Sequence, residues 1–299
     1  MFEGYKLVSH KNCADGSACA ILFQFLGGKD VVFVSPGEHA DEVALDLFHN
    51  FPGKIIFADI SVSLDVAEIL DGRKYDILLF DHHKSAIPLK QYPWCEIEEN
   101  NTRCGSMMFF DWIRKELWNR DALSLLDSYK RFIELVDDYD LWSKTYGQET
   151  EDLAALFLCL GQKLFVERFL NDASPDLLSK ERYLLDVDRK KKEHLLLQKK
   201  KEALVFIKHI QGKDRRVAFV TAKSHNNEIA EAIYNDADLD VDLVVLVSDR
   251  VSFRAPARSD IDCSVLAASF GAGGHRLSAG SSLKNIIGVD LLDLVASKI

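Results

Sequence analysis

Short apolar runs alternate with amphipathic stretches over the first third of the chain. The runs KLVSH, VVFVS, KIIFADI and DILLFDHH have the length and β-branched content of buried strands. Between them, residues 15–26, 39–50 and 64–70 carry apolar side chains at helical spacing. This alternation predicts an α/β fold with a parallel, doubly wound sheet.

The rest of the chain predicts further helices and a second, smaller α/β domain. The pattern is helical before Pro175, and a long polar and aliphatic stretch after it predicts a connecting helix to about Lys208. The strands RVAFVT, VDLVVLVS and RVSFRAP then alternate with the helices HNNEIAEAIYN and CSVLAASF. We expect a first domain over residues 1–175, a connecting helix over 176–211 and a second α/β domain over 212–299.

Polar residues that can bind metals occur at the carboxyl ends of the predicted strands or soon after them. They are His10, Asp15, Asp59, Asp81, His82, His83 and Asp138. Ligands of parallel α/β sheets bind at this edge. Carboxylates gathered in one cleft repel each other unless divalent cations offset their charge. Mixed oxygen and nitrogen ligands suit manganese, with iron, zinc or cobalt as alternatives. Two such ions, about 3.5–4 Å apart, can promote phosphoester hydrolysis.

Each of these residues also has a structural interpretation. Asp15 and Asp59 could cap the helices that follow them, and Asp137, Asp138 and Asp140 could form an acidic turn. A single Asp-His-His tripeptide is a weak signal. The order of the whole set along the strand ends favours one common site.

Composition limits the class of ligand and the compartment. The formal net charge of −10 argues against binding to long duplexes, because such binding depends on many lysines and arginines. The basic runs 189–192 and 199–201 are more typical of a solvated helix face. No segment has the apolar length of a membrane span, and the start MFEGYKLVSH lacks a signal-peptide pattern, so a cytoplasmic protein is expected. The six cysteines are widely spaced and predict reduced core residues.

Taken in order, the motifs resemble those of the DHH phosphoesterases. This family includes single-strand exonucleases, nanoRNases, cyclic-dinucleotide phosphodiesterases and family II pyrophosphatases. The segment FGAGGHRLSAG, residues 270–280, resembles the glycine-rich signature of the DHH-associated C-terminal domain. The resemblance covers nearly the whole chain. It implies a metal-binding catalytic DHH domain followed by a substrate-binding domain, as in the nanoRNase or oligoribonuclease-like branch.

The resemblance also implies roles for individual residues. Two divalent ions, with manganese expected, would be held by His10, Asp15, Asp59, His82 and Asp138, with Asp59 bridging them. Asp81 would orient the adjacent metal-bound imidazole. His83 would face the substrate phosphate or the leaving group and supply a proton or a hydrogen bond.

The glycine-rich segment would bind a phosphate of the substrate. Backbone amides at Gly273 and Gly274 can approach a phosphate closely, and His275 and Arg254 would add donors. A glycine-rich hairpin with a surface histidine is the structural alternative. Ala272 replaces one glycine of the family pattern.

The first motif departs from the family pattern. Many members have two aspartates two residues apart, whereas this chain has Cys13 before Asp15. With a thiol at this position, the first metal site could be weak, could prefer zinc or iron, or could use water in place of the carboxylate. We expect activity to survive, since His10 and Asp59 remain.

The sequence therefore favours a phosphodiesterase that releases mononucleotides from short single-stranded oligonucleotides held between its two domains. The alternatives are a monoesterase acting on a 3′-phosphorylated adenylate, a cyclic-dinucleotide phosphodiesterase and a non-catalytic nucleotide-binding module. Inorganic pyrophosphatase is less favoured, because those relatives carry a different C-terminal domain. A homodimer is left open.

Overall fold

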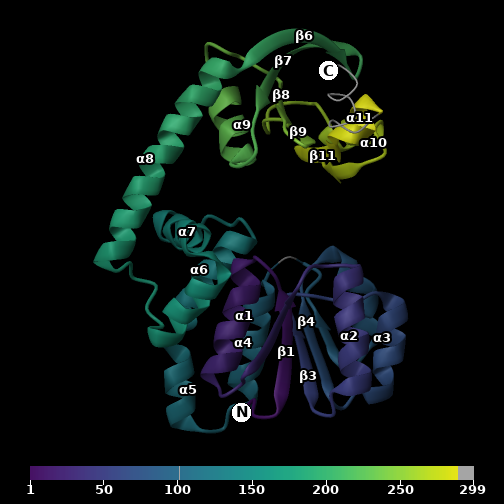
Figure 1. Ribbon diagram of the computed structural model, residues 1–299, viewed down its shortest axis with the longest axis vertical. Helices are drawn as coiled ribbons and strands as arrows, with labels where there is room; N and C mark the ends of the chain where they lie inside the picture. The colour runs from purple at the N-terminus through teal and green to yellow at the C-terminus, as the bar shows by residue number, and fades with distance from the viewer. Residues whose placement is uncertain (101, 289–299) are drawn as a thin grey trace, which may run out of the picture. The chain divides into compact units, whose positions relative to one another are not determined.

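The computed structural model describes residues 1–100 and 102–288. The chain divides into two compact units, Met1–Asp186 and Val187–Ile299. Each unit contains one β-sheet with helices packed against it (Figure 1). The predicted α/β class is confirmed for both units.

A parallel five-stranded sheet forms the centre of the first unit, in the order β2-β1-β3-β4-β5. Its strands are β1 (Tyr5–His10), β2 (Asp30–Val34), β3 (Lys54–Ala58), β4 (Ile77–Asp81) and β5 (Cys95–Ile97). The first four match the predicted runs. The chain passes from β1 to β2 and then returns past β1 to form β3. Strand order therefore reverses between β1 and β3, which is where ligands bind in open α/β sheets.

Helices cover both faces of this sheet, as the doubly wound prediction requires (Figure 1). One face carries α2 (Glu38–Asn50) and α3 (Leu64–Leu70). The other carries α1 (Ala14–Phe25), α4 (Gly105–Glu116), α6 (Lys130–Asp140) and α7 (Gln148–Asn171). The remaining helices are α5 (Arg120–Asp127) and the 3-10 helices Asp71–Arg73 and Lys84–Gln91. The larger apolar core lies on the α1 side of the sheet.

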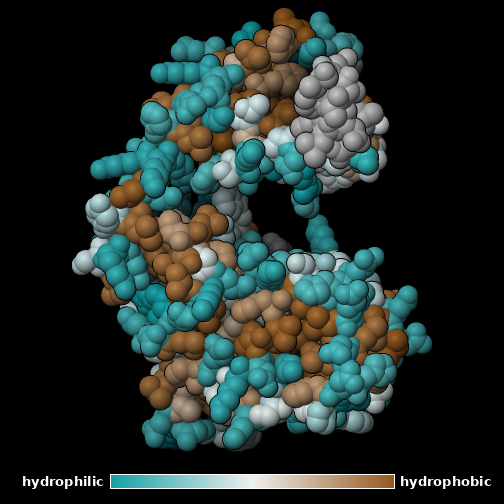
Figure 2. All heavy atoms as spheres, viewed as in Figure 1, coloured by the Kyte–Doolittle hydropathy of each residue, from teal (hydrophilic) through white to brown (hydrophobic). Residues whose placement is uncertain are grey.

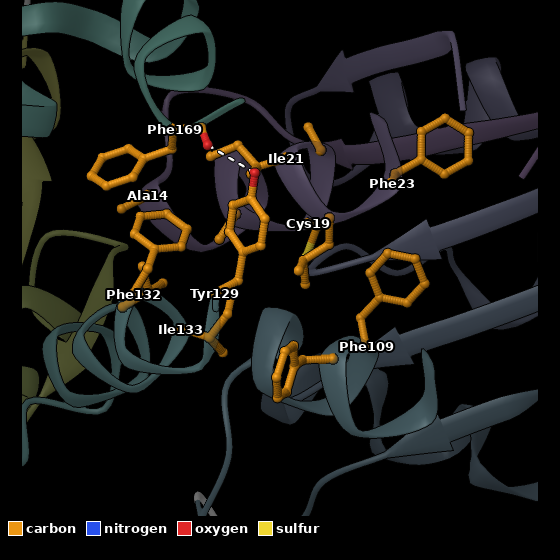
Figure 3. Packing of buried hydrophobic residues seen from close by; sticks show 14 of the residues in the cluster. Ala14, Cys19, Ile21, Phe23, Phe109, Tyr129, Phe132, Ile133 and Phe169 are labelled. Atoms are coloured by element: carbon orange, nitrogen blue, oxygen red, sulfur yellow. Dashed lines mark hydrogen bonds between the residues drawn. The ribbon is translucent and has the colours of Figure 1, made fainter. Parts of the chain in front are cut away.

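Aromatic side chains join α6 to α7 within this core (Figure 3). The rings of Phe132 and Phe169 stack with their centroids 4.2 Å apart. The buried hydroxyl of Tyr129 donates a hydrogen bond of 3.0 Å to the carbonyl oxygen of Phe169, in the last turn of α7. The last carbonyls of a helix have no amide donor within the helix, and this bond supplies a donor to one of them.

The division between the two units falls within the helix α8 (Ser179–Glu202). Only Glu181 and Leu185 of this helix are buried. Its basic runs are exposed or half-buried, and Lys199 and Lys200 form ion pairs with Glu202 and Asp236. The predicted extension of the helix to about Lys208 is wrong, because α8 ends at Glu202 and strand β6 (Leu204–Ile210) follows. The sequence LVFIKHI is apolar and partly β-branched, which favours a strand.

A two-residue turn fixes β6 against β7 (Lys213–Thr221) as an antiparallel hairpin. Gln211 and Gly212 both have positive φ, 49° and 80°. Hairpins with two-residue turns favour such conformations, because the twist of the turn then matches that of the strands. The first strand of the second sheet therefore lies within the segment that the sequence assigned to the connecting helix.

The second sheet has six strands in the order β10-β11-β9-β8-β7-β6. Strands β7 and β8 are parallel, and the other neighbours are antiparallel. The additional elements are β8 (Leu243–Val247), β9 (Arg250–Arg254), β10 (Gly273–His275), β11 (Ser278–Ser282), α9 (Asn226–Tyr234), α10 (Cys263–Ala268) and α11 (Leu283–Ile287). The last residues of the predicted second domain, 289–299, lie outside the described residues.

No helix within the described parts of the chain is both long and apolar enough to cross a membrane. On the face shown in Figure 2, hydrophilic residues are spread over both units with smaller hydrophobic areas between them.

The hydrogen bond between Tyr129 and Phe169 yields a test of the core. We expect Tyr129→Phe to lower the free energy of unfolding by about 1–3 kcal/mol, because the carbonyl of Phe169 stays buried without a donor. Urea denaturation followed by circular dichroism measures the change. Unchanged stability would show that water replaces the hydroxyl.

Candidate metal centre

The structure brings four predicted metal ligands together at the carboxyl edge of the first sheet. His10 ends β1, and Asp59 follows the last residue of β3. The Nδ1 atom of His10 lies 3.6 Å from Oδ2 of Asp59. The Nε2 atom of His82 lies 3.5 Å from Oδ1 of Asp59 and 3.8 Å from Oδ2 of Asp15. Asp59 is therefore central to the cluster, as a bridging ligand would be.

The carboxylate of Asp15 is fully buried and is held by the beginning of α4. It accepts hydrogen bonds from the backbone amides of Gly105 and Ser106, both at 2.8 Å. The first amides of a helix have no intrahelical acceptor and carry partial positive charge. Asp15 is at once a structural cap for α4 and a candidate ligand with a fixed orientation.

Asp59 occupies an unusual backbone conformation. Its φ is 59°, in the left-handed region that residues with a side chain seldom adopt. The start of α4 packs directly on it, since a Cβ atom placed on Gly105 would lie 2.7 Å from the Cα of Asp59. Only glycine at 105 permits this approach. Strain and close packing of this kind occur at functional sites.

Buried polar atoms around Asp59 lack hydrogen-bond partners. They are both carboxylate oxygens of Asp59, Nδ1 of His10 and Nε2 of His82. Leaving such atoms buried and unpaired is costly. Divalent cations among them would supply the missing interactions, and carboxylates with imidazoles are a suitable donor set. The residues present therefore fit a divalent-metal centre.

The pKa values show an excess of negative charge in this cluster. Burial and the charge of Asp59 raise the pKa of Asp15 well above its usual range. Burial opposes the protonation of His82, but Asp59, Asp15 and Asp140 outweigh it and raise the pKa of His82 to about 9. Burial and the charge of Asp59 also raise the pKa of Asp140 to about 6. The carboxylates thus favour a protonated imidazole or a bound cation among them.

The three aspartates of the segment VDDYD have different partners. Asp137 accepts a hydrogen bond from the backbone amide of Cys104, at 2.7 Å. The carboxylate of Asp138 points to the following loop and to α7, where it accepts bonds from Thr145 N at 2.7 Å and from the Thr150 hydroxyl at 2.5 Å. The structure therefore does not bring Asp138 to the predicted cluster.

Asp140 takes the place that the sequence analysis gave to Asp138. Its Oδ2 atom lies 3.2 Å from Nε2 of His82, and with Asp15 and His82 it forms a group that could hold one ion. Residues of α6 two positions apart point in directions that differ by about 200°. Composition alone cannot decide which carboxylate of the segment faces the site.

Asp81 orients His83 rather than the adjacent His82. Its fully buried Oδ1 lies 2.7 Å from Nδ1 of His83 and accepts from the backbone amide of His82 at 2.8 Å. The hydrogen bond to Asp81 raises the pKa of His83. Since Asp81 engages Nδ1, Nε2 is the nitrogen of His83 that remains for a substrate.

Gln162 supports the site, although the sequence analysis did not single it out. Its side-chain amide donates to the carbonyl of His10 and its oxygen accepts from the amide of Asn12, both at 3.1 Å. It follows a break in α7 at Gly161, where φ is 69°. The feature of the sequence that could have indicated this break is a glycine inside a helical pattern.

The substrate-binding candidates of the second unit lie on adjacent strands. Ser278 of β11 pairs with Arg254 on one side and with His275 on the other. A Cβ atom on Gly274 would lie 2.5 Å from the Cα of Ala279, so this hairpin requires glycine there. Gly273, Gly274 and His275 are exposed. The hairpin thus presents backbone amides and an imidazole, and Arg254 lies on the neighbouring strand β9.

The orientation of Arg254 is fixed by the protein. Its Nε donates to the side-chain oxygen of Asn227 at 2.8 Å, and its Nη1 donates to the carbonyl of Phe253 at 3.0 Å. Burial lowers the pKa of its guanidinium. A group held in this way loses little conformational freedom when it binds a phosphate.

The roles of the two α6 aspartates can be separated experimentally. We expect Asp140→Asn to weaken divalent-metal binding at least tenfold with little change in the stability of the metal-free protein, since it removes an inner ligand. Asp138→Asn should do the reverse, because it disturbs a buried hydrogen-bond network. Calorimetric titration with manganese and thermal unfolding measure the two effects. Equal loss of metal binding in both variants would contradict the assignment.

Comparison with known proteins finds similarity in sequence to one curated bacterial protein and in fold to solved structures. No protein-family model matches it. It is 26% identical over 300 residues to the oligoribonuclease NrnB of Bacillus subtilis strain 168, and the similarity covers 93% of this chain and 73% of NrnB.

Two solved structures resemble the chain over nearly its whole length. One is a pGpG-specific phosphodiesterase, PggH, from Vibrio cholerae, with 14% identity, coverage of 98% of this chain and 96% of that chain, and a TM-score of 0.56. The other is an uncharacterised protein from Helicobacter pylori G27, with 19% identity, coverage of 93% and 92%, and a TM-score of 0.46. The chain is therefore similar in sequence, over most of its length, to an enzyme named an oligoribonuclease, and its fold resembles that of PggH.

Proposed function

We propose that the protein is a divalent-metal-dependent phosphodiesterase that hydrolyses short single-stranded oligonucleotides or dinucleotides to mononucleotides. The observation that carries the proposal is the set of unpartnered carboxylate and imidazole atoms around Asp59 at the strand-order reversal of the first sheet. The similarity to NrnB, which is named an oligoribonuclease, supports this substrate class.

Two ion positions would share Asp59. One position is formed by Asp15, His82 and Asp140, and the other by His10 and Cys13. Divalent ions here, with manganese as the first candidate, would offset the charge of the phosphate and promote attack by water. Helix α4 fixes the carboxylate of Asp15 through two backbone amides, so this side of the cluster is rigid.

His83 would act on the substrate as a proton donor. Asp81 holds Nδ1 and raises the pKa of the ring, so His83 is protonated near neutral pH to a greater extent than a free histidine. Its side chain is 41% exposed, which leaves it accessible to a bound phosphodiester. A proton on Nε2 can pass to the leaving oxygen as the phosphorus–oxygen bond breaks.

The glycine-rich hairpin would bind a phosphate of the substrate. Its amides and His275 supply neutral or weakly charged donors, and Arg254 supplies a fixed cation. With a net charge of −10, the protein would attract short substrates, which need few phosphate contacts, better than long ones.

The central test is hydrolysis of a labelled dinucleotide in the presence of manganese, cobalt or zinc. We expect mononucleotide release that stops with a chelator. We also expect His83→Ala to lower kcat about 10²- to 10⁴-fold, while calorimetry shows unchanged metal binding. Lack of mononucleotide release with every divalent ion would refute the proposal. A parallel panel of 3′-phosphoadenylate and cyclic dinucleotides would rank the alternatives.

A separate test concerns Arg254. We expect Arg254→Ala to raise KM for a dinucleotide roughly tenfold or more, because a charge-assisted hydrogen bond is lost, with a smaller effect on kcat. The exposed Arg250 at the other end of β9 provides a matched control, and Arg250→Ala should leave KM unchanged. A similar rise of KM in both variants would indicate a general charge effect.

A further inference from the structure

A cysteine takes part in the second ion position. The Sγ atom of Cys13, a ring nitrogen of His10 and a carboxylate oxygen of Asp59 all lie within 4.8 Å of one another. In a tetrahedral zinc site with bonds of about 2.0–2.3 Å, ligand atoms are roughly 3.3–3.8 Å apart. The 3.6 Å between Nδ1 of His10 and Oδ2 of Asp59 already fits this range.

Two of the three atoms at this position need a ligand. Asp59 is 1% exposed, and neither of its carboxylate oxygens has a hydrogen-bond partner. The buried Nδ1 atom of His10 also has none. These atoms lie 3.6 Å apart without a hydrogen bond, so they point to a cation independently of the cysteine.

The thiol of Cys13 lies at the beginning of helix α1. Cys13 occupies the N-cap position of α1 in an extended conformation, φ −123° and ψ 141°, and its side chain makes no capping hydrogen bond. The turn from His10 to Cys13 is held from outside, because Gln162 binds the amide of Asn12 and the carbonyl of His10. Gln162 of α7 thus holds the backbone between the imidazole and the thiol.

The two ion positions differ in their chemistry. Asp15, His82, Asp140 and Asp59 offer three carboxylates and one imidazole, a set that suits manganese. His10, Cys13 and Asp59 offer nitrogen, sulfur and oxygen, a set that favours zinc, iron(II) or cobalt(II). Asp59 is the donor common to both.

We propose that Cys13 is a direct metal ligand that makes the His10–Cys13–Asp59 position selective for zinc, cobalt(II) or iron(II) over manganese and magnesium. The inference rests on the proposed function only in using the same metal centre. On binding, the sulfur–hydrogen bond breaks, its proton passes to solvent, and a sulfur–metal bond forms without any change in oxidation state. The protein would then work with two different ions.

Cobalt(II) titration of the metal-free, full-length protein tests the proposal by absorbance. We expect a thiolate-to-cobalt charge-transfer band in the near ultraviolet that saturates with one equivalent. Cys13→Ser should abolish this band and weaken zinc binding by at least the roughly 10- to 100-fold seen when an outer-shell partner is lost. Serine suits an N-cap, so the variant should fold, and circular dichroism checks this.

Cys95→Ser is the matched control, since Cys95 is another partly buried free cysteine and belongs to none of the candidate metal groups among the described residues. It should retain the band. Cys13→Asp should lose the band and bind a second manganese ion, counted by electron paramagnetic resonance.

A wild-type protein without the band, or a Cys13→Ser variant that keeps it, would overturn the proposal. The spectrum does not depend on turnover. Failure of the proposed function would therefore appear as the band without hydrolysis, and failure of this inference as hydrolysis without the band.

Discussion

The main physical constraint on the first unit is that several carboxylates are buried together at one edge of its sheet. Most of them are satisfied by the protein itself. Asp15 binds the first amides of α4, and Asp81 binds the amide of His82 and the ring of His83. Asp59 is different, because neither of its oxygens has a partner. The arrangement thus leaves one central carboxylate without hydrogen bonds, whose burial is offset by the imidazoles of His10 and His82 at 3.5–3.6 Å and by any cation bound among them.

Strand ends were predictable from sequence because buried parallel strands are short, continuous apolar runs. His10, Asp59 and His82 follow such runs, and the topology of a parallel sheet brings their carboxyl ends to one edge. The same reasoning found β7, β8 and β9 in the second unit. Local pattern and global fold agree in these segments.

Positions that depend on helix rotation or on a tight turn were not predictable in this way. Asp138 and Asp140 differ only in the direction in which α6 presents them, and a shift in the helix start would exchange their roles. Strand β6 was hidden because its seven residues continue the apolar spacing of α8, and it is the turn at Gln211 and Gly212 after it that pairs it with β7. Gln162 depends on a break in α7 that periodicity does not encode.

The left-handed backbone at Asp59 affects how the stability of the protein depends on divalent ions. Glycine would adopt this conformation with less strain, and it would also remove a buried carboxylate that has no hydrogen bonds. With an aspartate here, bound ions stabilise the folded state, and this stabilisation grows with the logarithm of the free ion concentration above the dissociation constant. The lifetime of the protein would then depend on the concentration of divalent ions. At low ion concentration the protein would unfold and be degraded more readily, whether or not substrate is present.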